Sequence, residues 1–368
     1  MGEDNQVNIE DKNYLEVPKI KDLDLTEREK TLTKIDILKK FASGTGLREG
    51  LNDIVSGGMG ALILISNPNA FNVFKGGFYV NCKFTSKRLF ELAKMDGAII
   101  LSEDFKKILY ANTLLVPSMA FNSIETGTRH QAAERSARQI NGLVMAVSER
   151  RGSISIYYGN SRYVLQNTHE LLRRATETLQ ILEKQREVFN ELITNLNVLE
   201  VTGLVSVADV CTILERLEMI RKMSNIINEY IVELGKDGII VRMRMREITK
   251  GIEEKEDVLI KDYVTRPART RQFFDSLTFD ELLDLEHIAE VLFGKSLETS
   301  ISPKGFRLLS KTNLKKSEID LLIKHFKNLD NIFNTGKDGL YKVMKERTDD
   351  LKKELSSLRE HIMVGKKI

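Results

Sequence analysis

GALILIS at residues 60–66 and GAIIL at residues 97–101 decide the fold class. Each run opens on glycine, is short and apolar, and is rich in β-branched residues, which predicts a buried strand. Three further runs have the same character, at residues 107–116, 143–147 and 153–159. Helices are predicted between the strands at residues 86–95 and 128–140. The front of the chain is therefore predicted to be an α/β domain with a central mixed sheet.

Glycine and proline are scarce in the middle of the chain. Residues 1–165 hold 14 of the 23 glycines, whereas residues 166–234 hold only Gly203. Because glycine and proline interrupt helices, the middle is predicted to be an all-α spine. Apolar residues recur at three- and four-residue steps in two stretches, which predicts a helix-bundle core, with an oligomerisation surface as the alternative. The stretches are Leu172, Ala175, Leu179, Leu182, Phe189, Ile193 and Leu196, then Val207, Val210, Leu214, Leu217, Ile220, Ile227, Ile231 and Leu234.

Charge is nearly balanced overall but not along the chain. Lys and Arg number 56 and Asp and Glu 53, a net charge of +3, which excludes a wholly basic coat protein and a disordered polyelectrolyte. Residues 301–368 carry 16 basic and 9 acidic residues, or +7, which leaves −4 for residues 1–300. The basic tail indicates either a solvated helical face or contact with the phosphates of a nucleic acid.

The compartment is expected to be the cytoplasm. The first 25 residues have neither the basic nor the apolar part of a signal peptide. The longest apolar run, residues 61–65, is far shorter than the ~20 residues that cross a bilayer. Two cysteines, Cys82 and Cys211, are too few for a disulfide framework or a cysteine-rich metal site.

Several common site motifs are absent from the sequence. It has no GxxxxGK[ST] phosphate loop, no GxSxG elbow and no HExxH metal motif. Gly58-Met59-Gly60 precedes a predicted strand instead of following one, so it is not a dinucleotide fingerprint. These absences count against serine hydrolases and zinc proteases.

Two segments carry residue types suited to chemistry on phosphates. Lys94–Ala98 places the Asp96 carboxylate at a helix-to-strand junction, followed by small residues. Glu125–Arg135 places a glycine, a hydroxyl and Arg129 at the start of a helix, where free amides and the positive dipole end attract anions. A carboxylate for a divalent cation together with cations for phosphates is typical of phosphoryl transfer.

The same residues also allow simpler interpretations. Thr128 and Gln131 fit a capping box, which needs no ligand. The adjacent Arg150 and Arg151 follow a predicted strand, either as ordinary surface or as phosphate contacts at a strand end.

The two segments resemble the D-G-A and R-H-R motifs of the diadenylate cyclase family, here Asp96-Gly97-Ala98 and Arg129-His130-Gln131. The flanking residues 44–51 and 148–151 agree with the same family. The whole order resembles the DNA integrity scanning branch, in which a cyclase domain, a helical spine and a C-terminal helix-hairpin-helix module assemble into an octamer. The resemblance implies the bounds 1–26 for an N-terminal extension, 27–165 for the cyclase, 166–297 for the spine and 298–368 for the C-terminal domain.

The resemblance also implies a reaction. Two ATP condense into cyclic di-AMP with release of two pyrophosphates, at a site formed by two cyclase domains face to face. The resemblance makes Asp96, Arg129 and His130 catalytic, with Asp96 holding Mg²⁺ or Mn²⁺. It also implies DNA, including branched DNA, as a partner in DNA-damage surveillance and repair beside the nucleoid. The ATP-binding residues that it implies are Gly97, Ala98, Leu115, Thr128, Arg129, His130, Gln131, Ala132, Ser148, Arg150 and Arg151.

Two departures from the family pattern stand out. Gln131 replaces the second arginine of R-H-R, so a scaffold or sensor that binds DNA or nucleotide with a weakened cyclase is the alternative function. Residues 339–355 lack the Gly-hydrophobic-Gly turn that grips a DNA phosphate. Four lysines of the tail are the remaining candidates for DNA contact: Lys304, Lys311, Lys315 and Lys316.

Overall fold

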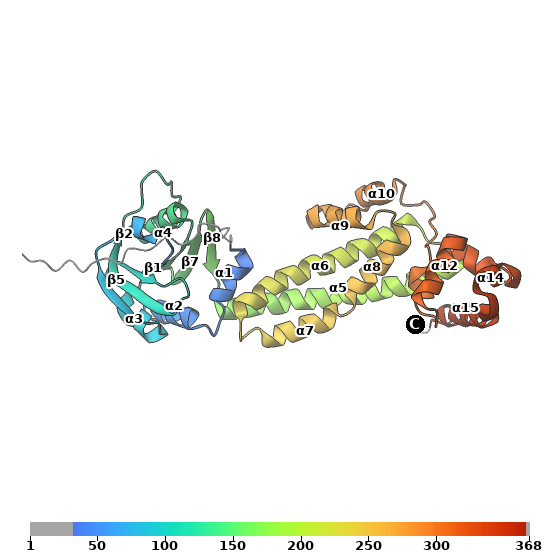
Figure 1. The fold of residues 1–368 in the computed structure, drawn as a ribbon, viewed down its shortest axis with the longest axis horizontal. Helices are drawn as coiled ribbons and strands as arrows, with labels where there is room; N and C mark the ends of the chain where they lie inside the picture. Colours follow the sequence, from blue (N-terminus) through green and yellow to red (C-terminus); the bar gives the residue numbers. More distant parts are fainter. Residues whose placement is uncertain (1–31, 366–368) are drawn as a thin grey trace, which may run out of the picture.

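The computed structural model describes residues 32–365, so the predicted extension at residues 1–26 lies outside the described residues. The molecule is elongated (Figure 1). An α/β domain lies at one end, a bundle of long helices forms the middle, and a group of short helices lies at the other end.

The α/β domain is built on an eight-stranded mixed sheet, which confirms the predicted fold class. The five predicted strands are β1 (Ala61–Ile65), β4 (Ala98–Leu101), β5 (Lys107–Leu115), β6 (Leu143–Ser148) and β7 (Ser153–Tyr158). The order is β2-β5-β4-β1-β6-β7-β8, with β3 also paired to β5, and the β1–β4 pair is parallel while the other pairs are antiparallel. Three strands were not predicted: β2 (Phe74–Lys75), β3 (Phe78–Lys83) and β8 (Ser161–Leu165). They lie at the sheet edges and are largely exposed, so they lack a continuous apolar run.

Helices cover both faces of this sheet. On one face lies α4 (Thr128–Ile140), at the predicted bounds; on the other lie α1 (Lys34–Lys40), α2 (Gly46–Ser56) and α3 (Ser86–Ala93). Strand β1 contributes Leu62 and Leu64 to the core under α4, and Ala61, Ile63 and Ile65 to the opposite core. Because both faces of β1 are buried, its sequence is apolar throughout.

The spine consists mainly of two long antiparallel helices, α5 (Thr168–Thr202) and α6 (Val207–Leu234). Gly203 ends α5 with a φ of +69°. Further helices pack beside them: α7 (Ile239–Thr249), α8 (Ile252–Tyr263), α9 (Pro267–Ser276) and α10 (Leu285–Phe293). The predicted stripes form the spine core, with one correction. Leu172 is 37% exposed, and its neighbour Leu171 occupies the buried position, four residues before the buried Ala175.

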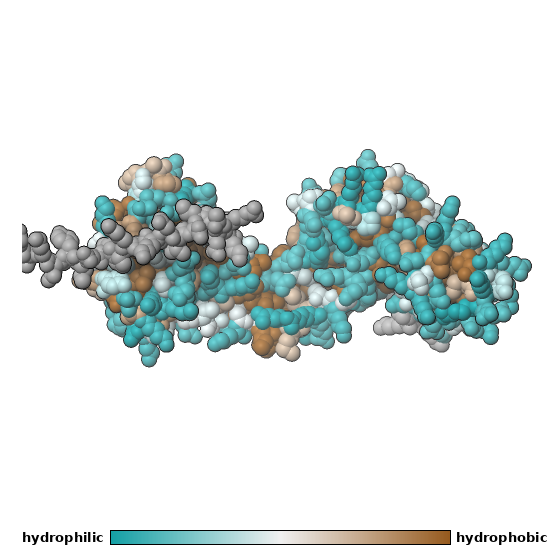
Figure 2. Space-filling model, viewed as in Figure 1, coloured by the Kyte–Doolittle hydropathy of each residue, from teal (hydrophilic) through white to brown (hydrophobic). Residues whose placement is uncertain are grey.

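Short helices form the last part of the chain, around a core that also includes Val201 at the end of α5. They are α11 (Phe306–Leu309), α12 (Lys316–Phe326), α13 (Leu329–Asn334), α14 (Lys337–Met344) and α15 (Thr348–Met363). Within residues 32–365, none of the helices combines the length and apolar character that a membrane crossing requires. The surface is mainly hydrophilic, with an apolar area at the α7 end of the spine (Figure 2), where Ile239, Ile240 and Met243 are exposed.

A buried polar cluster joins the short helices to the spine. The Asp262 carboxylate, at the end of α8, accepts hydrogen bonds from the backbone N–H groups of residues 305–307 at 2.6–2.8 Å. Beside it, Arg307 forms an ion pair with Glu200 of α5 at 2.5 Å. Burial, followed by the nearby charge of Glu200, raises the pKa of Asp262 to about 6.

Candidate nucleotide site

The strand register brings the two candidate phosphate-binding segments, residues 94–98 and 125–135, to one end of the sheet. Leu62 pairs with Ala98, so the starts of β1 and β4 lie side by side. Ala61 pairs with Val147, so the end of β6 lies beside the start of β1. Helix α4 runs antiparallel to β6 after a short turn, which brings its first residues to the same end. Asp96, the start of α4 and Ser148 therefore share one end of the domain.

Asp96 is exposed at this end, just before β4. It makes no hydrogen bond or ion pair with the residues that the structure describes, so its carboxylate is available to a ligand. The next residue, Gly97, has a φ of +91°, and a Cβ there would lie 2.7 Å from the backbone oxygen of Thr113. The Thr113 hydroxyl donates to the Ala98 oxygen at 2.9 Å. Glycine is thus required here, because β5 passes directly behind the backbone.

Arg129 extends from the first turn of α4 across the start of β1. Its guanidinium lies against Gly60, where an added Cβ would lie 2.8 Å from Cζ and closer still to Nη1. Nη1 is 3.6 Å from a carboxylate oxygen of Glu149, in the turn between β6 and β7, and the arginine side chain is 44% exposed. Gly60 therefore provides the space that seats Arg129.

His130 points the other way, toward the sheet. Its Nδ1 lies 2.9 Å from the hydroxyl oxygen of Tyr157 in β7. Tyr157 is buried, and its hydroxyl donates to Glu125 over 2.9 Å. Burial lowers the pKa of His130, the nearby Glu125 carboxylate opposes this, and the guanidinium groups of Arg162, Arg151 and Arg129 lower it further.

The predicted capping box at Thr128 and Gln131 is wrong. The N-cap of α4 is Gly127, which has no side chain to form a capping bond, and its carbonyl accepts the first helical hydrogen bond from the Gln131 N–H at 2.8 Å. The Gln131 side chain instead donates to the backbone oxygen of Glu125, also at 2.8 Å. It thereby fastens the loop before α4, which Glu134 also holds by accepting from the Ser123 hydroxyl at 2.6 Å.

The remaining predicted residues differ in their exposure. Thr128, Arg150 and Arg151 are exposed, and Ala132 and Ser148 are half-buried. The two arginines form no ion pair with any residue from 32 to 365. Leu115 is only 8% exposed and belongs to the core under α4, so only its edge is open to a nucleotide base. Its role at adenine stays a prediction.

The donor set around Asp96 suits a magnesium-type ion that arrives with phosphates. Among the described residues there is no group of three or more His, Cys, Asp or Glu side chains that could hold a metal by itself. Mg²⁺ is commonly bound by one or two carboxylates, with water and substrate phosphates completing its shell. A single free carboxylate beside phosphate-binding groups fits that pattern.

Comparison with known proteins assigns the family. Residues 48–162 match the family model described as DisA bacterial checkpoint controller nucleotide-binding, and residues 165–300 match the model for the linker region of the same controller. The DNA integrity scanning protein DisA of Acetivibrio thermocellus is 40% identical over 85% of this chain and 90% of its own length. Its counterpart in Clostridium botulinum is 40% identical over 92% and 99%.

The chain belongs to the DNA integrity scanning protein family. The resemblance inferred from the two motifs is thereby confirmed. Residues 48–162 are the nucleotide-binding diadenylate cyclase domain of that family. A solved structure of DacA from Staphylococcus aureus is 20% identical over 36% of this chain and 88% of its own, with a TM-score of 0.28.

Several residues of this end of the domain were not predicted as site residues. Gly60 and Glu149 hold Arg129, while Glu125, Tyr157 and Arg162 lie behind His130. Their contacts join residues distant in sequence, so spacing along the chain gives no sign of them. The strand sequence SISIYY does not single out Tyr157, because Ser153, Ser155 and Tyr158 carry hydroxyl groups as well.

Proposed function

We propose that this end of the domain is the half-site of a diadenylate cyclase that condenses two ATP into cyclic di-AMP and two pyrophosphates. The observation that carries the proposal is the meeting of a free carboxylate, Asp96, with a helix start and the cation of Arg129. A carboxylate alone repels phosphates, and cations alone give no place for a metal. Their combination suits a metal-bound polyphosphate.

Each group has a distinct task in this proposal. Asp96 holds Mg²⁺ or Mn²⁺, an ion that neutralises phosphate charge when bound. Arg129 and the free amides of residues 128–130 bind phosphate oxygens, with Arg150, Arg151 and Ser148 as further contacts. Gly97 lets the nucleotide approach the backbone, whereas Ala98 is fully buried in the core under α4 and its carbonyl accepts from Thr113. Gln131, which fastens the loop before α4, acts on the site through that loop.

The reaction needs a second copy of the chain. One sheet end offers one such set of groups, whereas the product joins two nucleotides, each 3′-hydroxyl attacking the α-phosphate of the other. Face-to-face pairing brings the two ATP together, and this proximity replaces an encounter in solution. The exposed Val116, Met119 and Ile124 flank the site in the loop before α4, where pairing would cover them. The apolar area on α7 supplies a further contact for a homo-octamer.

An incubation with ATP and either Mg²⁺ or Mn²⁺, read by chromatography, tests the cyclase. We expect cyclic di-AMP from the wild type and none from Asp96→Asn or Arg129→Ala. Lys87→Ala, an exposed change on α3, is the control and should retain full activity. Tight ATP binding without product in the wild type would favour the alternative, a nucleotide sensor with a decayed cyclase, for which Gln131 is the specific observation.

We also propose that the last helices contact DNA phosphates, in the cytoplasm beside the nucleoid. Lys304 is engaged elsewhere, because its ammonium donates to the backbone oxygens of Lys261 and Val264 at 2.9 and 3.1 Å. Lys311, Lys315 and Lys316 are exposed. They adjoin α15, since the Asn313 backbone N–H donates to Glu354 at 3.2 Å.

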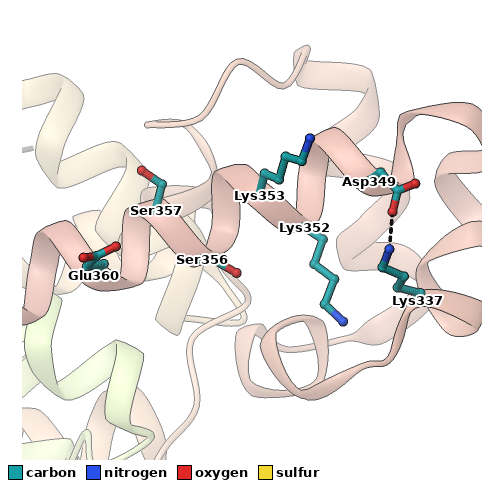
Figure 3. A pocket seen from close by; sticks show the side chains of 7 residues that line it. All are labelled: Lys337, Asp349, Lys352, Lys353, Ser356, Ser357 and Glu360. Atoms are coloured by element: carbon teal, nitrogen blue, oxygen red, sulfur yellow. Dashed lines mark ion pairs between the residues drawn. The ribbon is translucent and has the colours of Figure 1, made fainter.

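A shallow hollow lined by residues of α14 and α15 offers two further cations (Figure 3). It measures about 410 Å³ and is lined by Lys337, Asp349, Lys352, Lys353, Ser356, Ser357 and Glu360. Lys337 forms an ion pair with Asp349 at 2.7 Å, whereas Lys352 and Lys353 extend without a partner among the described residues. Free lysines of this kind give binding that depends on salt but not on sequence.

Fluorescence anisotropy with branched and linear DNA across a salt series tests the DNA proposal. We expect Lys352→Ala combined with Lys353→Ala to weaken binding to both DNAs and to reduce the salt slope by about 2. Lys87→Ala should leave both quantities unchanged. Absence of binding by the wild type even at low salt would refute the proposal.

A further inference from the structure

A chain of hydrogen bonds runs from His130 to Tyr157 and on to Glu125. Tyr157 Oη is 2.9 Å from His130 Nδ1 and donates to Glu125 Oε1, also over 2.9 Å. Arg162 of β8 approaches the same oxygen with its Nε at 2.7 Å. Tyr157 is 1% exposed and the Glu125 side chain 12%, so water has little access to this chain.

The chemistry of these groups fixes the direction of each bond. The Glu125 carboxylate, paired with Arg162, only accepts, so the Tyr157 hydroxyl uses its one proton to donate to it. The Tyr157 oxygen then serves His130 as an acceptor, which places the imidazole proton on Nδ1. In the neutral ring, Nε2 therefore carries the lone pair.

We propose that Tyr157 and Glu125 are positioning residues that hold His130 in the Nδ1–H tautomer and present Nε2 as a hydrogen-bond acceptor to a ribose hydroxyl of the nucleotide. The identity of the ligand rests on the proposed function, whereas the hydrogen-bonded chain stands without it. A lone pair suits a hydroxyl, which donates, and not a phosphate oxygen, which only accepts. Arg129 and the helix amides already serve the phosphates.

The charges around His130 agree with a neutral ring. Glu125, from the loop before α4, raises the pKa of His130. Burial lowers the pKa most, and three arginines lower it too: Arg162 from β8, Arg151 from the β6–β7 turn and Arg129 from α4. His130 thus remains an acceptor to lower pH than a histidine in water.

The first test does not depend on activity. Diethyl pyrocarbonate acylates neutral imidazole, so labelling of His130 in the full chain, followed by mass spectrometry across pH, reports its protonation. We expect Tyr157→Phe to move the labelling midpoint of His130 to lower pH, because the imidazolium loses the acceptor for its Nδ1–H. Glu125→Gln should move it in the same direction by removing the carboxylate.

A matched control lies one residue away in β7. The Tyr158 hydroxyl accepts from the Leu32 N–H at 3.2 Å, and Tyr158→Phe should leave the midpoint unchanged. Four other histidines act as internal references: His169, His287, His325 and His361.

Kinetics supply the second test. Tyr157→Phe should lower kcat about tenfold with little change in KM for ATP, since the tautomer with a free Nε2 is no longer enforced. It should also move the acid limb of the pH–rate profile to lower pH. Glu125→Gln should move that limb but retain kcat at its plateau, because Tyr157 still accepts from His130.

Two results would overturn the proposal. One is a labelling midpoint in Tyr157→Phe equal to that of the wild type. The other is a loss of activity in Tyr157→Phe through KM with an unmoved acid limb, which is what a purely structural tyrosine would give. If the wild type makes no cyclic di-AMP, the proposed function fails, and the labelling alone still decides the role of Tyr157 and Glu125.

Discussion

Replacing Gly60 by alanine should displace the Arg129 side chain without destabilising the fold. Gly60 does not have a positive φ, so alanine suits its backbone. The added Cβ would overlap the Arg129 guanidinium, which is the mobile end of a flexible side chain and moves aside. We therefore expect Gly60→Ala to fold normally, with a free energy of unfolding unchanged or raised by up to about 1 kcal/mol.

The effect on activity follows from the contact that is lost. A hydrogen bond to a charged group contributes ~1.5–3 kcal/mol, so displacement of Arg129 from its phosphate should lower kcat/KM by about 10- to 150-fold. Pyrophosphate release measures the rate, and urea denaturation measures stability. Gly46→Ala is the matched control, because its Cβ would make an ordinary 3.5 Å contact with Phe84 away from the site. Full activity in a folded Gly60→Ala protein would refute the role given to Arg129.

Three further predictions concern other positions. Gln131→Arg should retain or raise turnover, because arginine keeps a donor for the Glu125 carbonyl and adds a cation; a tenfold fall in kcat would contradict this. Gly97→Ala should lose roughly 1–3 kcal/mol of stability in urea denaturation, together with activity, because its φ of +91° and the Thr113 backbone oxygen leave no room for Cβ. The pKa of Asp262, raised to about 6 from 3.8, means that the folded chain keeps a proton that the unfolded chain has released between these pH values. The free energy of unfolding should therefore fall by roughly 2 kcal/mol as pH rises from 4 to 7, and Asp262→Asn should lack this fall; parallel pH profiles would show that Asp262 does not titrate there.

The α/β fold could be predicted because its central strands have a distinctive sequence pattern. Strands buried on both faces, such as residues 61–65, must be apolar at every position, and glycines mark their starts. The edge strands β3 and β8 are mostly exposed, and their sequences mix polar with apolar residues. They therefore lack the continuous apolar pattern by which the central strands were predicted. At the start of α5, Leu171 is buried instead of the predicted Leu172. Both are leucines, so the three- and four-residue spacing alone does not show which of the two faces the core.

The site was predictable where chemistry and local structure coincide. Asp96 and Arg129 were recognisable because a carboxylate and a cation stood at a strand start and a helix start. The contacts of Gly60 and Tyr157 could not be read from the sequence, because they depend on the register of β1, β6 and β7. Gln131 fitted a capping box by spacing, yet the N-cap is Gly127 instead of Thr128, and the side-chain amide of Gln131 donates to the backbone oxygen of Glu125.

A structure of the full chain with 3′-deoxy-ATP and Mg²⁺ tests the central claim most directly, because this nucleotide lacks the attacking hydroxyl and cannot react. We expect two nucleotides between two facing domains, with phosphates at the start of α4 and a metal on Asp96. A nucleotide bound away from this end of the sheet, with Asp96 and Arg129 left in solvent, would contradict it.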